Sequence, residues 1–182
     1  RMLRKITVAG FGGQGVMLLG QTLAHAGNEQ GLNTLWFPSY GPETRGGTAN
    51  CSITISSEYI NSPTFSKATT LIILNPPSMD KFKDRLIDGG VILYNSNMFF
   101  EDVKKENATI YPIPANDIAL ELGNIRTSNM VMLGGYLAIY DEIKKETIFE
   151  SLKEMLGERR KHLIPVNIKA IEAGYAYVRG LL

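Results

Sequence analysis

Apolar runs alternate with amphipathic stretches along this chain, in the order expected of an α/β protein. Continuous apolar runs at Met2–Ala9, Thr70–Leu74 and Val91–Tyr94 predict strands that are buried on both faces. Apolar residues at helical spacing between about Gln14 and Gln30 predict a helix that packs one face on the sheet. The alternation predicts one α/β domain over residues 1–182, with a mostly parallel sheet flanked by helices.

Two further segments predict how the chain packs. From Ala49 to Ser56 apolar and polar residues alternate, which predicts a half-buried strand. Ser128 is placed to cap a helix over Asn129–Tyr140. That helix is apolar on nearly all sides, so we expect it to be buried, with a partner chain as one candidate cover. Gly134-Gly135 within it predicts a close contact with another helix.

A glycine-rich turn separates the first predicted strand from the first predicted helix. Its sequence, Gly10-Phe11-Gly12-Gly13-Gln14-Gly15, has the spacing G-x-G-x-x-G. Glycine allows a tight turn and a close approach by phosphate, and the helix start behind it offers unpaired N–H groups. The turn is therefore a candidate phosphate cradle, and the alternative is a tight strand-to-helix turn packed against a neighbour. The candidate binding residues are Gly10, Gly12, Gly13, Gln14 and Gly15.

A dinucleotide site of the Rossmann type would need one more feature. An acidic residue at the end of the second strand normally holds the ribose. The second predicted strand, Asn33–Ser39, ends without Asp or Glu. The Rossmann-like turn is thus present without one of the main parts of a dinucleotide site.

A second glycine-rich loop follows this strand. It places hydrogen-bonding and charged side chains between glycines, and it should lie beside the first loop if the first two strands are neighbours. Arg45 could bind a carboxylate or phosphate through two hydrogen bonds, or it could pair with Glu43 or with a partner subunit. The candidate binding residues here are Tyr40, Gly41, Glu43, Arg45, Gly46 and Gly47.

Composition narrows the function further. The net charge of +1 provides no basic field for nucleic acid, and no apolar run reaches the length of a membrane span. One cysteine, Cys51, allows neither an internal disulfide nor a cluster held by four thiolates, and we expect it to be buried rather than reactive. We expect a cytoplasmic protein with no catalytic or metal-binding residues of its own.

Together the two loops resemble the gamma subunit of 2-oxoacid:ferredoxin oxidoreductases. The resemblance rests on Gly10–Gly15 and on Ser39-Tyr40-Gly41-Pro42-Glu43-Thr44-Arg45-Gly46-Gly47. Three later pieces fit in the same order: Ser56–Pro63, the two segments Ala119–Asn124 and Asn129–Gly134, and Ala173-Gly174-Tyr175. The form of the second loop is closer to the 2-oxoglutarate and branched-chain members than to the pyruvate members.

This resemblance implies an enzyme that oxidatively decarboxylates a 2-oxoacid, transfers the acyl group to coenzyme A and reduces ferredoxin. It implies thiamine diphosphate, magnesium and iron–sulfur clusters on partner chains, namely the alpha, beta and ferredoxin-like delta subunits. It also implies a structural or site-completing role here, with coenzyme A as a candidate shared ligand. The alternative is a free-standing module that binds a nucleotide or phosphate. The isolated chain is a candidate homodimer, because an apolar helix made for a missing partner would drive self-association.

Overall fold

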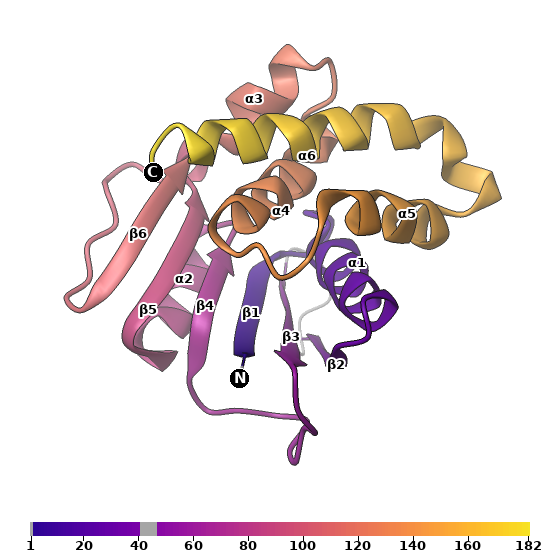
Figure 1. The fold of residues 1–182 in the computed structure, drawn as a ribbon. Helices are drawn as coiled ribbons and strands as arrows, with labels where there is room; N and C mark the ends of the chain where they lie inside the picture. Colours follow the sequence, from indigo (N-terminus) through magenta and orange to yellow (C-terminus); the bar gives the residue numbers. More distant parts are fainter. Residues whose placement is uncertain (1, 41–46) are drawn as a thin grey trace.

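The computed structural model describes residues 2–40 and 47–182, and it is built around a six-stranded sheet (Figure 1). The strand order is β2-β3-β1-β4-β5-β6. The strands are β1 (Leu3–Phe11), β2 (Asn33–Tyr40), β3 (Thr48–Ser56), β4 (Ala68–Ile73), β5 (Leu86–Asn95) and β6 (Ala108–Ile113). The predicted α/β class is confirmed.

One strand runs against the others. β3 is antiparallel to both β1 and β2, whereas β1, β4, β5 and β6 pair in parallel. β3 therefore lies between β1 and β2, so the condition stated for the two loops to meet, that the first two strands are neighbours, does not hold. The hairpin from β2 to β3 inserts its second strand beside β1, and this leaves β2 at the edge of the sheet.

Helices cover the two faces of the sheet unequally (Figure 1). α1 and α4 pack on one face, with α5 against α1 and α6 against α4, whereas the short α2 lies on the other face. The helices are α1 (Val16–Glu29), α2 (Pro76–Phe82), α3 (Ala115–Glu121), α4 (Ser128–Ile139), α5 (Lys145–Leu156) and α6 (Ile164–Arg179). The described residues also include 3-10 helices at Lys83–Arg85, Ser96–Met98, Ile125–Thr127 and Glu158–Leu163.

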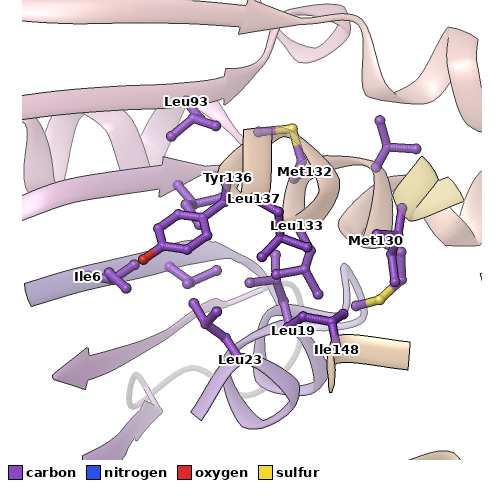
Figure 2. Close-up of a cluster of buried hydrophobic side chains, with 14 of the residues drawn as sticks. Ile6, Leu19, Leu23, Leu93, Met130, Met132, Leu133, Tyr136, Leu137 and Ile148 are labelled. Atoms are coloured by element: carbon purple, nitrogen blue, oxygen red, sulfur yellow. The ribbon is translucent and has the colours of Figure 1, made fainter. Parts of the chain in front are cut away.

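α4 is buried inside the chain. Its residues Met130–Leu137 are buried between the sheet and α6, and Figure 2 shows Leu133 and Tyr136 packed towards Leu19 and Ile6. The helix therefore needs no partner chain as a cover, and this ground for predicting a homodimer is removed. Ser128 lies inside the first turn of α4 and does not cap it, because its hydroxyl bonds to Asn116 and to the carbonyl of Ile125.

The prediction that β3 is half-buried is wrong. The apolar residues Cys51, Ile53 and Ile55 are buried, as expected, and the hydroxyl residues Thr54 and Ser56 on the other face are buried as well. β3 is an inner strand with pairing partners on both sides, and its small polar side chains are shielded by neighbouring chain. Alternation in the sequence therefore marked two faces of different polarity, both of them buried.

Candidate functional site

The glycine turn joins β1 to α1 at the carboxyl edge of the sheet. Gly13 and Gly15 have positive φ angles of 89° and 77°, which favour glycine. The backbone N–H of Phe11 donates to Oε1 of Gln14 at 2.6 Å, and the N–H of Gln14 donates to the Phe11 carbonyl at 3.2 Å. Among the described residues no side chain caps the start of α1, and its first N–H groups lack intrahelical partners.

Two glycines of the turn make room for side chains of this chain itself. A Cβ at Gly10 would overlap Oε1 of Gln14, and a Cβ at Gly15 would overlap the amide of Asn129 in α4. A Cβ at Gly13, by contrast, would meet no atom of the described residues within 4 Å. The packed-turn alternative therefore accounts for Gly10 and Gly15, and the space for a ligand lies on the side of Gly13.

Part of the second loop meets the first. The N–H of Gly12 donates to the carbonyl of Gly47 at 3.1 Å, just before β3 begins. The loops are adjacent because β3 lies beside β1, and not because β2 does. The candidate residues Gly41, Glu43, Arg45 and Gly46 lie outside the described residues, as does the side chain of Tyr40.

A cavity of about 220 Å³ opens beside the glycine turn. It lies where β1 and β4 are neighbours but continue into helices on opposite faces of the sheet, α1 and α2. This is the position where open α/β sheets bind ligands. The cavity is lined by Gly13, Gln14, Leu74, Asn95, Met98, Asn116, Ile125, Arg126, Ser128 and Asn129.

Side-chain amides form the polar part of this cavity. Asn95 accepts hydrogen bonds from the N–H groups of Asn97 and Ala115 and donates to Oδ1 of Asn116 at 3.0 Å. Nδ2 of Asn129 donates to the Gly15 carbonyl at 3.1 Å and so ties α4 to the start of α1. The uncharged amides thus join β5, the 3-10 helix Ser96–Met98 and α3 to one another, and α4 to the start of α1.

Of the residues that line this cavity, the sequence predicted Gly13 and Gln14 as binding residues and did not predict the others. Asn95 ends β5, and Asn116 lies in the first turn after β6. Polar residues that follow consecutive parallel strands meet at the same edge, and this signal could have pointed to them. Arg126, Ser128 and Asn129 come from the region between α3 and α4, for which the sequence offers no comparable signal.

Other candidate groups lie away from this cavity. Burial raises the pKa of the Cys51 thiol to about 12, against a smaller lowering by the nearby indole N–H of Trp36, so Cys51 is not a reactive thiol. A larger depression of about 580 Å³ between α1 and α5 is lined by four glutamates, at positions 29, 146, 150 and 154, which would repel an anionic ligand. In the described part of the chain, no three His, Cys, Asp or Glu side chains cluster as metal ligands.

Comparison with known proteins identifies the family. The family model described as pyruvate ferredoxin/flavodoxin oxidoreductase matches residues 5–177. The chain belongs to this family. The resemblance inferred from the two glycine loops is thereby confirmed. Among the described residues of this family member, no helix has both the length and the apolar composition needed to cross a membrane.

Three relatives of this oxidoreductase family member are informative. The ketoisovalerate oxidoreductase subunit VorA of Methanothermobacter thermautotrophicus is 39% identical over 96% of this chain, which spans 36% of the relative. A solved 2-oxoglutarate:ferredoxin oxidoreductase from Magnetococcus marinus, with 2-oxoglutarate, coenzyme A and succinyl-CoA bound, is 28% identical with a TM-score of 0.89. It is matched over 100% of this chain and 32% of its own.

A third structure matches end to end. The gamma subunit of a keto/oxoacid ferredoxin oxidoreductase from Geobacter sulfurreducens is 26% identical with a TM-score of 0.83, over 97% of this chain and 99% of its own. The same fold therefore occurs both as a separate subunit and as about a third of a longer chain.

Proposed function

We propose that residues 1–182 form one gamma-type domain of a 2-oxoacid:ferredoxin oxidoreductase. The end-to-end match to a separate gamma subunit carries this proposal. The complete enzyme would join 2-oxoacid decarboxylation to acyl transfer onto coenzyme A and reduction of ferredoxin. A branched-chain 2-oxoacid is the favoured substrate, because identity to the ketoisovalerate relative is 39%, against 32% to a 2-oxoglutarate synthase subunit from Methanocaldococcus jannaschii.

We assign the decarboxylation of the 2-oxoacid and the transfer of electrons to partner chains. The single cysteine is buried and protonated, so this chain does not fit an iron–sulfur cluster, and its described residues offer no evident set of ligands for magnesium and thiamine diphosphate. We assign these cofactors to alpha, beta and ferredoxin-like delta partners, and the whole assembly to the cytoplasm. The role of this chain is then structural or site-completing.

Coenzyme A is the ligand this chain is proposed to share. The cavity at the carboxyl edge lies next to the uncapped start of α1, whose N–H groups favour phosphate, and Arg126 stands exposed at its rim. At about 220 Å³ the cavity is smaller than a pocket that encloses a drug-sized molecule. Only a part of coenzyme A would enter it, with the remainder held by a partner chain.

Co-purification tests the proposal. A tagged chain should co-purify with larger chains that carry thiamine diphosphate and iron–sulfur clusters. The purified complex should reduce a dye when it is given a branched-chain 2-oxoacid and coenzyme A and no other substrate. The isolated chain should be inactive. Turnover by the isolated chain would contradict the subunit role, and a chain that purifies alone would make nucleotide binding the leading function.

Two loop variants separate folding from function. Arg45→Ala should weaken assembly or activity of the complex more than it lowers the melting temperature of the chain, because a loop arginine adds little to a core. Gly12→Val should abolish any binding of a nucleotide at the turn, because the branched side chain would block the close approach. Binding that is unchanged in Gly12→Val would place the ligand elsewhere.

A further inference from the structure

β2 is an edge strand of the sheet with little protection against pairing with another chain (Figure 1). Edge strands normally avoid such pairing through charges, bulges, prolines or short length. The eight residues of β2 include no charged side chain, and their pairing with β3 runs without a bulge. A proline, Pro38, is the one protective feature, so the direction in which its backbone points decides how much of the edge is free.

Hydrogen bonds across the sheet show that Pro38 faces outward. The N–H of Leu74 donates to the Ala9 carbonyl at 2.9 Å, so Ala9 of β1 points its backbone groups towards β4. Its neighbour Val8 then points towards β3, where it is paired with Cys51. Because Cys51 bonds to β1, its partner on the other side, Pro38, turns its backbone groups away from β3.

The outward backbone groups of β2 form a row from Thr34 to Pro38. Backbone direction alternates along a strand, so Thr34 and Trp36 face outward together with Pro38. Within the described residues, the N–H and carbonyl groups of Thr34 and Trp36 and the carbonyl of Pro38 form no backbone hydrogen bond on this side. Pro38 lacks only the N–H, as is usual for a proline on an edge strand. The row therefore offers both donors and acceptors to a further strand.

Two apolar side chains lie on the open face of the same strand. The other face of β2 is covered by α1, where the Thr34 hydroxyl donates to the Ala24 carbonyl at 3.1 Å. Leu35 and Phe37 point away from α1, because side chains alternate between the faces of a sheet, and they are 37% and 48% exposed. The free edge thus carries an exposed apolar pair beside its unpaired backbone.

We propose that β2 pairs with β2 of a second copy of this chain, antiparallel about a two-fold axis at Trp36. In this arrangement the N–H of each Trp36 donates to the Trp36 carbonyl of the other copy. The N–H of each Thr34 donates to the Pro38 carbonyl of the other copy. Only the two bonds that Pro38 cannot donate are missing from the ladder.

The side chains favour a second copy and this register. Each Leu35 lies opposite the Phe37 of the other copy, and cross-strand pairs of an aromatic and an aliphatic side chain stabilise sheets. An axis one residue to either side would set Phe37 against Asn33 or Leu35 against Ser39, which are polar partners. Because β2 carries no charge, its own copy brings no like-charge repulsion to the strand pair.

The mass of the purified full-length chain in solution tests the pairing. Size-exclusion chromatography with light scattering, over a dilution series up to about 0.5 mM, should show a concentration-dependent dimer. We expect the molar mass to rise from 20.1 kDa towards about 40 kDa, twice the mass of the chain. A mass of one chain at every concentration overturns the proposal and leaves this edge to a different partner.

Phe37→Lys is the decisive variant. The side chain is half exposed, so the change spares the core, and a lysine on an edge strand opposes pairing. We expect the dissociation constant of the dimer to rise about tenfold or more. Phe100→Lys makes the same chemical change at a fully exposed aromatic residue after β5, away from β2, and should dimerise as the wild type does. Equal dimerisation of the wild type and Phe37→Lys overturns the proposal.

Hydrogen exchange of the wild-type chain covers the case in which Phe37→Lys fails to fold. The amides of Thr34 and Trp36 face solvent in a single copy and are bonded in the dimer. We expect their exchange, followed by NMR, to slow about tenfold or more between dilute and concentrated samples. A dimer in which these two amides stay unprotected places the contact elsewhere and overturns the proposal. No other chain is present, so the result is independent of the test of the subunit role.

Discussion

Gly174 of α6 lies directly against the carbonyl oxygen of Val131 in α4. A Cβ at position 174 would overlap that oxygen, and a Cβ at Gly134 of α4 would in turn overlap the carbonyl oxygen of Ile171. The two helices therefore touch backbone to backbone, and reciprocal glycines make this possible. The contact holds the outer helix over the inner one, whose N-terminal end carries Asn129.

Gly174→Ala should be strongly destabilising. The added methyl group has backbone on the far side and cannot be accommodated by a rotamer change, so the helices must separate. We expect a loss of about 3 kcal/mol or more in the free energy of unfolding, measured by urea denaturation. Gly180→Ala, near the end of the chain, should stay within about 0.5 kcal/mol. Similar losses in both variants would show that the close contact is not the cause.

Gly15 and Asn129 should be energetically coupled. Gly15→Ala introduces a Cβ at a φ of 77° and against the Asn129 amide, whereas Asn129→Ala removes the amide and its hydrogen bond. In the double variant the overlap with the amide is gone, and what remains is the backbone strain and a tight contact of 3.2 Å with the Cβ of residue 129. Its destabilisation should fall short of the sum of the single variants by about 1 kcal/mol or more. Strict additivity in a double-mutant cycle would contradict the contact.

Cys51 should make stability depend on alkaline pH. Its pKa is raised from 9.0 to about 12, so the folded state holds the proton more tightly than the unfolded state does. The resulting stability is fully present below pH 9 and is lost as the pH rises towards 12. The advantage of wild type over Cys51→Ala should shrink by about 1.4 kcal/mol per pH unit in this window.

Urea denaturation of both proteins between pH 8 and 10.5 measures this advantage. The tyrosines Tyr136 and Tyr140, whose pKa values are also raised by burial, titrate in both proteins and cancel in the comparison. Parallel pH profiles of the two proteins would contradict the prediction.

Arg4 should stabilise the amino end of the sheet. Its guanidinium forms an ion pair with Glu142 and lies 4.4 Å from the centre of the Tyr140 ring, whose hydroxyl bonds to Thr70 at 2.8 Å. Arg4→Lys keeps the charge but loses the flat stacking group, and we expect a cost of about 1 kcal/mol in thermal or urea unfolding.

An exposed ion pair serves as the control for Arg4. Lys161 and Glu158 are 3.0 Å apart on one helical turn, with both side chains largely in solvent. Lys161→Ala should cost less than about 0.5 kcal/mol, because exposed ion pairs contribute little. If Arg4→Lys is as mild as Lys161→Ala, the stacking on Tyr140 does not stabilise the fold.

The local features of this chain could be predicted from the sequence. Side-chain periodicity predicted the apolar strands β1, β4 and β5. The backbone freedom of glycine predicted the tight turn before α1. The Gly134-Gly135 pair also predicted a close helix contact, which the structure places against α6. These features depend on neighbours in sequence, so a single sequence was enough to predict them.

Tertiary structure alone decided the strand order and the cavity. The insertion of β3 beside β1 depends on pairing between residues far apart in the chain, which periodicity does not encode. Asn129 reaches the carbonyl of Gly15 across 114 residues, and it fills the space that a glycine motif by itself would leave to a phosphate. The sequence thus determined that the turn needs glycine, and only the packing of α4 against α1 decided what occupies the space beside Gly15.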